Sequence, residues 1–177
     1  MSKLSKGFIH IYTGNGKGKT TAALGQALRA AGAGLKTYIA QFMKEYPYSE
    51  LNSVKLLSEF ITIEQFCGDE FVYKKQLPDE SEIIKAIDGL NKAKIKMMSN
   101  DYDIIILDEA IVSIYFKLLT VEQIIDFINY KPADVELILT GRYCPEILIE
   151  KADLVTEMKE VKHYYSKGVT SRKGIES

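Results

Sequence analysis

Residues 13–21, which read TGNGKGKTT, constrain the fold of this chain more than any other stretch. They follow an apolar, β-prone run at residues 8–12 and precede a run of helix formers at residues 22–31. A glycine-rich loop that ends in Gly-Lys-Thr between a strand and a helix is typical of a phosphate-binding loop, or P-loop. The first turn of the following helix adds the positive end of its dipole at the same point. The sequence therefore predicts a site for a nucleotide triphosphate.

Each residue type in this loop has a physical reason to be there. Glycines let the backbone turn its N–H groups inward, Lys19 adds a positive charge for phosphate oxygens, and the Thr20 hydroxyl can ligate magnesium. Thr13 stands where the usual pattern, G-x-x-x-x-G-K-[ST], has its first glycine. The alternative is a surface turn that binds nothing, but both flanks favour the P-loop. We predict nucleotide contacts from Gly14, Asn15, Gly16, Lys17, Gly18, Lys19, Thr20 and Thr21.

Length and composition narrow the class of protein. A chain of 177 residues suits one compact domain, and we expect residues 1–177 to form it. With 23 basic and 24 acidic residues the chain is nearly neutral, so its charge gives no reason to expect a nucleic-acid partner. No stretch reaches the length of a membrane span, and the N-terminus lacks the apolar core of a signal peptide. With Cys67 and Cys144 as its two isolated cysteines, the sequence predicts a soluble cytoplasmic protein with no membrane partner.

The rest of the chain alternates between strand and helix patterns. This alternation predicts an α/β fold with a mostly parallel sheet, helices on both faces and a ligand site at the carboxyl ends of the strands. Further strands are expected at residues 35–42, 60–66, 103–109, 135–140 and 154–156. Residues 43–57 are expected to form a loop with a short helix, and residues 67–75 a loop. Later helices are predicted at residues 79–99, at residues 110–129 with a break near Thr120, and after Pro145.

Two strand ends carry charged residues that suit a nucleotide site. Residues 104–107 are apolar and lead into Asp108 and Glu109, which is the form of a Walker B strand. Either carboxylate can hold magnesium directly or through water as a partner of Thr20, and the alternative is a pair of solvated acids. Arg142 follows the strand at residues 135–140, where it can stabilise polyphosphate charge or simply lie on the surface.

Other candidates carry weaker signals. His163 has the chemistry of a base, but a lone histidine is more often structural. Arg29, late in the first helix, is by default a solvated residue. Aromatic residues between residues 66 and 73 can cover a flat apolar ligand, although most aromatic side chains simply pack in a core.

Several segments together carry a resemblance to a known family. In order and at similar spacing, the chain contains the segments at residues 13–23, 41–44, 107–109, 140–142, 161–163 and 174–176. Together they resemble the P-loop type of ATP:corrinoid adenosyltransferase, over about residues 7–176. Threonine at the first position of the loop is itself a feature of that family, so Thr13 supports the resemblance.

The resemblance implies a RecA-like P-loop NTPase fold, usually in a homodimer. The reaction would transfer the 5′-deoxyadenosyl group of ATP to a reduced Co(I) corrinoid and release triphosphate, with an electron-donating reductase as partner. ATP would lie reversed in the loop, with Mg²⁺ or Mn²⁺ held by Thr20, Asp108 and Glu109. The resemblance also assigns catalytic roles to Lys19, Thr20, Glu109 and Arg142, and it places Arg29 near the nucleotide.

The corrinoid side departs from the family pattern. Members often carry Phe-x-Trp after a glycine at the position of Gly68, and these aromatics are thought to displace the lower ligand of the corrinoid. Here Asp69 and Phe71 take those places, Tyr73 follows, and the chain has no tryptophan. By this match we predict corrinoid contacts from Phe71, Tyr73 and His163.

Two other functions remain compatible with the P-loop. A P-loop ATPase or small-molecule kinase would transfer the γ-phosphoryl group and make ADP. A nucleotide-binding regulator or cobalamin-handling module would bind without turnover. A kinase typically adds an Arg-rich lid between later elements, and the sequence shows no convincing one.

Overall fold

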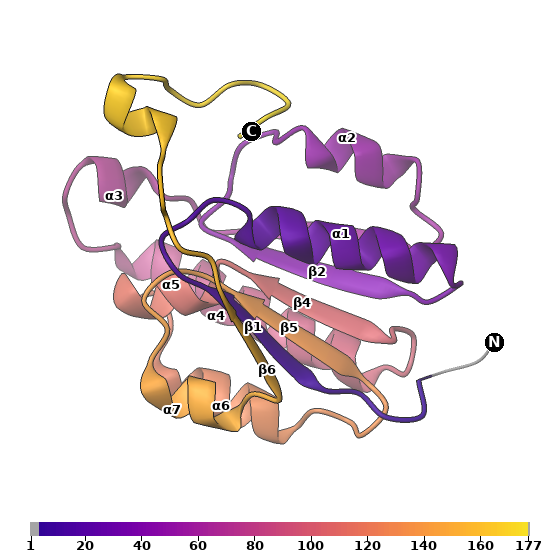
Figure 1. Cartoon of the computed structure of the whole chain (residues 1–177). Helices are drawn as coiled ribbons and strands as arrows, with labels where there is room; N and C mark the ends of the chain where they lie inside the picture. Colours follow the sequence, from indigo (N-terminus) through magenta and orange to yellow (C-terminus); the bar gives the residue numbers. More distant parts are fainter. Residues whose placement is uncertain (1–3, 177) are drawn as a thin grey trace.

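A computed structural model describes residues 4–176, in which a six-stranded sheet lies between two layers of helices (Figure 1). The strand order is β3-β2-β4-β5-β1-β6, and every pairing in it is parallel. The central strand β4 is buried along its whole length, as its continuous apolar run requires. The strands are β1 (Ile9–Thr13), β2 (Thr37–Phe42), β3 (Ile61–Phe66), β4 (Ile104–Asp108), β5 (Glu136–Thr140) and β6 (Leu154–Glu157).

Helices cover both faces of the sheet and define two apolar clusters (Figure 1). One face carries α1 (Lys19–Gly32) and α2 (Glu50–Lys55), which bury alanines and Val54 against the sheet. The other face carries α4 (Glu80–Met98), α5 (Ala110–Tyr115), α6 (Val121–Asn129) and α7 (Glu146–Lys151) over the larger cluster. Among residues 4–176, no helix has the length and apolar character needed to cross a membrane.

The predicted α/β class and the order of elements are confirmed, with shifts of a few residues at the ends. Helix α4 begins after Asp79, whose side chain accepts a hydrogen bond from the Glu82 backbone N–H at 2.9 Å. The break near Thr120 is also confirmed, because Thr120 and Gln123 form a capping box that starts α6.

Residues 67–75 were predicted to be a loop, and this prediction was wrong in part. They contain the single helical turn α3 (Glu70–Tyr73), whose Phe71 is buried and packs edge-on to Phe116 at 5.9 Å between ring centroids. One turn is too short for its apolar spacing to reveal a helix, and tertiary packing of Phe71 stabilises it. The 3-10 helix Tyr164–Lys167 is likewise absent from the predicted elements.

The topology places four strand ends side by side. Strand β5 lies between β1 and β4, and β2 lies on the other side of β4. All of these strands run in the same direction, so the residues that follow them gather at one edge of the sheet. The loop after β1, Asp108, Thr140 and the segment after β2 therefore become neighbours.

Candidate functional site

The loop after β1 has the backbone of a P-loop. Gly14 and Gly18 have φ angles of 93° and 121°, in the left-handed region where a side chain would be strained. Thr13 is the last residue of β1 and pairs with Glu157 of β6, so its extended backbone has no need of glycine. The loop is also tied to the chain after β6, because the Gly16 N–H donates to the Met158 carbonyl at 2.6 Å.

Lys19 begins α1 and is 6% exposed. Its ammonium group donates to the carbonyl oxygens of Gly14 and Gly16, both at 2.8 Å. Burial lowers the pKa of Lys19, the Glu109 carboxylate opposes this shift, and Arg142 adds to it. The lysine therefore lies inside the curve of its own loop, with a charge that a bound anion would stabilise.

The Asp108 carboxylate, 1% exposed, is the centre of the site and is held from three elements. Its Oδ1 accepts hydrogen bonds from the Thr20 hydroxyl of α1 at 2.9 Å and the Thr140 hydroxyl of β5 at 2.6 Å. Its Oδ2 accepts from Lys44 Nζ, just after β2, at 2.7 Å and from Gln41 Nε2 at 3.2 Å.

These contacts set the charge of Asp108. Burial by itself would raise the pKa of the Asp108 carboxyl, but the Lys44 ammonium and the hydroxyl donors outweigh it and hold the pKa below its ordinary value. The same ion pair raises the pKa of Lys44 although burial opposes the shift. The pair is therefore an ionised carboxylate and a charged ammonium in a site that water barely reaches.

Glu109 differs from its neighbour although both residues are acidic. Its backbone is in the left-handed region, with φ 60°, and its N–H donates to Thr140 Oγ1 at 2.9 Å. The Glu109 carbonyl accepts from the Ser113 hydroxyl at 2.9 Å, which fixes the turn into α5. Burial and the negative charge of Asp108 raise the pKa of Glu109.

Two pockets open beside the P-loop and share part of their lining. The smaller, of about 270 Å³, is called the loop pocket, and the larger, of about 470 Å³, the neighbouring pocket. Both are lined by Lys17, Thr20, Thr21, Glu109 and Glu176. The loop pocket is completed by Gly16, Gly18, Lys19, Arg142 and His163. A polar cavity with several cations and helix-terminal N–H groups suits a polyphosphate.

The C-terminal segment contributes to the lining of these pockets, Gly174 and Ile175 in the neighbouring pocket and Glu176 in both. In Figure 1 the end of this segment, drawn in yellow, lies near α1 and α2. Lys17 Nζ donates to the Ile175 carbonyl at 2.8 Å. Glu176 accepts from the Tyr164 hydroxyl and pairs with Arg172 at 3.1 Å. The last described residues are thereby joined to the P-loop.

Most of the predicted site residues come together, but Arg29 does not. Arg142 and His163 lie at the loop pocket with Lys19 and Glu109, although they come from distant parts of the sequence. Arg29 is exposed in the last turn of α1, ten residues after Lys19 and so about 15 Å further along the helix axis.

Three residues of the site had no role predicted from the sequence: Lys44, Gln41 and Thr140 through its side chain. All three donate a hydrogen bond to the Asp108 carboxylate, and Thr140 also accepts one from the Glu109 backbone N–H. A signal was available, because Gln41 and Lys44 lie at the end of a predicted strand and Thr140 directly precedes Gly141 at the end of another. Polar residues at the carboxyl ends of parallel strands gather at one edge of a sheet.

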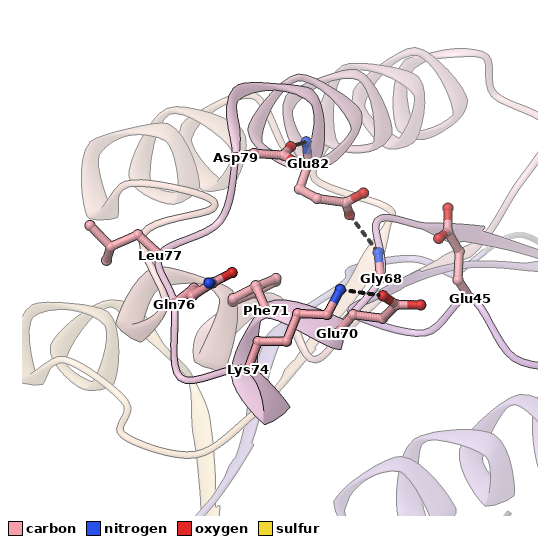
Figure 2. A pocket seen from close by; sticks show the side chains of 9 residues that line it. All are labelled: Glu45, Gly68, Glu70, Phe71, Lys74, Gln76, Leu77, Asp79 and Glu82. Carbon is pink, nitrogen blue, oxygen red and sulfur yellow. Dashed lines mark hydrogen bonds and ion pairs between the residues drawn. The ribbon is translucent and has the colours of Figure 1, made fainter.

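A separate pocket of about 310 Å³, the α3 pocket, lies between α3, the segment that follows it and the start of α4 (Figure 2). Its lining includes Phe71 and four carboxylates, and Glu82 accepts from the Gly68 N–H at 2.7 Å. Phe71 is 8% exposed, whereas Tyr73, the last residue of α3, is 78% exposed. The carboxylates are Glu45, Glu70, Asp79 and Glu82.

Comparison with known proteins identifies relatives along nearly the whole chain. The family model described as "ATP:corrinoid adenosyltransferase BtuR/CobO/CobP" matches residues 5–177. The corrinoid adenosyltransferase of Escherichia coli (strain K12) is 35% identical over 172 residues, which are 97% of this chain and 86% of the relative. The corrinoid adenosyltransferase CobA of Salmonella typhimurium is 33% identical over the same shares of the two chains.

A solved structure supports the fold. The KaiC-like protein PH0186 from Pyrococcus horikoshii OT3 superposes with a TM-score of 0.61 at 19% identity, over 98% of this chain and 77% of that one. At this identity the similarity concerns the fold alone, and it confirms the predicted RecA-like arrangement of a P-loop NTPase.

Proposed function

The chain belongs to the ATP:corrinoid adenosyltransferase family, and from this premise we propose that it alkylates a Co(I) corrinoid and releases triphosphate. Membership makes it a transferase that acts on ATP and a corrinoid. In the proposed reaction, cobalt attacks the ribose 5′ carbon and forms a Co–C bond. The C5′–O bond breaks and its electron pair leaves with triphosphate, while cobalt is oxidised from Co(I) to Co(III).

The observation that carries this proposal is the set of cations around the loop pocket. Lys17, Lys19 and Arg142 line the same cavity of about 270 Å³. In a substitution whose nucleophile is the second substrate, the protein has to align the reactants and stabilise the charge that develops on the leaving group. A P-loop that surrounds the whole triphosphate stabilises the charge on this leaving group with cations and N–H groups that are already in place.

The residues around Asp108 fit a divalent cation that travels with the nucleotide. Thr20, Asp108 and Glu109 offer the oxygen donors that Mg²⁺ or Mn²⁺ prefers. Within residues 4–176, no three His, Cys, Asp or Glu side chains cluster so as to hold an ion, so phosphate oxygens would complete the coordination. When bound, the metal would neutralise part of the charge on the departing triphosphate.

Exposed tyrosines support a place for the corrinoid. Tyr46, Tyr165 and Tyr73 are 54%, 72% and 78% exposed, and the pKa of Tyr73 is raised mainly by Asp69 and also by the two other tyrosines. Such a group of rings suits a large flat ligand. We propose that Tyr73 and His163 contact the corrinoid and that Phe71, which is buried, shapes the wall behind them.

The remaining parts of the proposal rest on the family resemblance of the sequence. They are a homodimeric assembly and a reductase that supplies the electron for Co(I). Arg29 stays a proposed nucleotide contact on the same ground, with its position at the far end of α1 against it. A cytoplasmic location is also proposed, from the composition of the sequence with its two isolated cysteines.

Product analysis tests the reaction. The protein is incubated with Mg-ATP and chemically reduced cobalamin, and the polyphosphate product is identified while the Co–C bond is followed by its absorption. We expect triphosphate and adenosylcobalamin in equal amounts. ADP without adenosylcobalamin would instead identify a P-loop ATPase or kinase, and binding without either product would identify a regulator or carrier.

A further inference from the structure

The ammonium group of Lys44 lies where the oxygens of the P-loop and of β4 meet. Lys44 Nζ is 2.7 Å from Asp108 Oδ2 and 3.2 Å from Thr20 Oγ1. The Thr20 hydroxyl is itself 2.9 Å from Asp108 Oδ1. A positive charge therefore lies against two of the three groups that are expected to hold a divalent cation.

The surroundings of Lys44 hold its ammonium group in a fixed, buried position. The residue is 8% exposed, and its ammonium lies 5.2 Å from the centre of the Tyr48 ring. Glu109 and Glu50 add negative potential at the same point. A buried charge with several fixed partners has a defined position, unlike the mobile end of a surface lysine.

We propose that the Lys44 ammonium is the cation that Thr20 and Asp108 hold when no nucleotide is bound. Because of this charge, the site binds its metal only together with a triphosphate. The inference rests on the proposed function, because it takes the metal ligands from there. Without a nucleotide, a divalent ion at these oxygens would lie within a few ångströms of the ammonium, and the two like charges would repel each other. A bound triphosphate supplies negative charge for both cations and removes this obstacle.

The test uses the nucleotide-free protein and Mn²⁺ alone, read by electron paramagnetic resonance and by thermal unfolding. Wild type is compared with Lys44→Met, which removes the charge and keeps the length of the side chain. We expect Lys44→Met to bind Mn²⁺ at least about tenfold more tightly than wild type. At about 100 times its dissociation constant, Mn²⁺ should raise the Tm of this variant by roughly 5–10 °C and that of wild type by at most about half as much.

Two further variants separate this role from general charge effects. Lys85→Met removes another lysine that lies between two carboxylates, Glu45 and Glu82, at 3.2 and 2.8 Å. It should bind Mn²⁺ no better than wild type. The double variant Lys44→Met/Asp108→Asn loses both the ammonium and the carboxylate charge, and should also lose the metal-dependent rise in Tm.

Wild type alone also tests the proposal if Lys44→Met does not fold. Inorganic tripolyphosphate should convert wild type from no detectable Mn²⁺ binding to stoichiometric binding. Tight Mn²⁺ binding to wild type without any phosphate would overturn the proposal. So would a folded Lys44→Met variant that is destabilised in EDTA but gains no Mn²⁺ affinity, because Lys44 would then be a structural ion pair. Either result would leave the adenosyl transfer to be decided by its own products.

Discussion

The charged side chains around Asp108 are buried and share their hydrogen bonds, whereas those around α3 are mostly exposed and form ion pairs at the surface. Asp108 is 1% exposed and has partners on α1, β5 and the end of β2. At α3, Lys74 and Glu70 form an ion pair at 2.9 Å between side chains that are 61% and 69% exposed. The Asp108 edge of the candidate site is fixed before a ligand binds, whereas the side chains around α3 are free to adjust.

This difference matches the two proposed substrates. Charge that develops on a leaving group is best stabilised by dipoles and cations that need no rearrangement, and the Asp108 edge provides these. A large flat corrinoid offers mainly apolar contact, for which exposed rings such as Tyr73 are suited. The exposed side chains of α3 and the charged groups around the α3 pocket are together called the α3 rim. Loss of a group at the Asp108 edge should therefore disturb the fold or the chemistry, while loss of a group at the α3 rim should change binding alone.

Asp108→Ala should give the largest effect on stability. It leaves the Lys44 ammonium buried without its carboxylate, and breaking a buried pair in this way typically costs about 3–5 kcal/mol. Urea unfolding measures the loss. Asp126→Ala is the matched control, because Asp126 pairs with Lys94 at 3.0 Å but is 61% exposed, and its loss should cost less than about 1 kcal/mol. Equal effects of the two substitutions would remove the distinction between the edges.

Lys19→Ala should abolish most of the activity and keep the fold. Its ammonium contacts two backbone carbonyls of the loop, which solvent can reach through the loop pocket once the side chain is gone. One preorganised electrostatic contact is typically worth ~10²–10³ in rate. Initial rates of adenosylcobalamin formation measure the effect, with Lys96→Ala on α4 as control. Retention of more than about a tenth of the wild-type rate would contradict the assigned role.

The same contrast explains which features were predictable from the sequence. The P-loop and the Asp108-Glu109 strand end depend on short runs of adjacent residues, and the structure brings them together as expected. The α/β sheet followed from the alternation of strand and helix patterns. Helix α3 was missed because it has one turn and depends on the contact of Phe71 with the distant Phe116.

The end of a predicted strand placed Lys44 at the edge of the sheet, but its contact with Asp108 could not be derived from the sequence, for a similar reason. Its partner Asp108 is 64 residues away, and the contact exists only because β2 and β4 are adjacent in the sheet. Alternation of strands and helices indicates parallel pairing but leaves the strand order open. Arg29 shows the opposite case, in which a motif match predicts a nucleotide contact for a residue that lies ten positions after Lys19, in the last turn of α1.

Tyr73→Ala should change corrinoid binding and leave the fold intact. Tyr73 is 78% exposed, so the substitution should alter the free energy of unfolding by less than about 0.5 kcal/mol. Loss of one aromatic contact is worth about 0.5–1.5 kcal/mol, which corresponds to a twofold to tenfold rise in the KM for the corrinoid. The KM for ATP should not change. Tyr130→Ala, on the exposed end of α6 at 51% exposure, is the control for a general loss of surface rings. An equal rise in both KM values would mean that the α3 rim is not a separate binding edge.

Lys85→Ala should give the smallest effect, and its salt dependence sharpens the contrast with Asp108. Lys85 pairs with Glu45 and Glu82, but its side chain is 46% exposed, and such pairs typically contribute about 0.2–1 kcal/mol. Salt at about 1 M reduces the screening length to about 3 Å, so the contribution of Lys85 should fall towards zero. The contribution of Asp108 should persist, because ions in solution do not reach its buried contacts. Urea unfolding of both variants at low and high salt measures this, and a salt-insensitive loss at Lys85 would show that the α3 rim is as rigidly held as the P-loop edge.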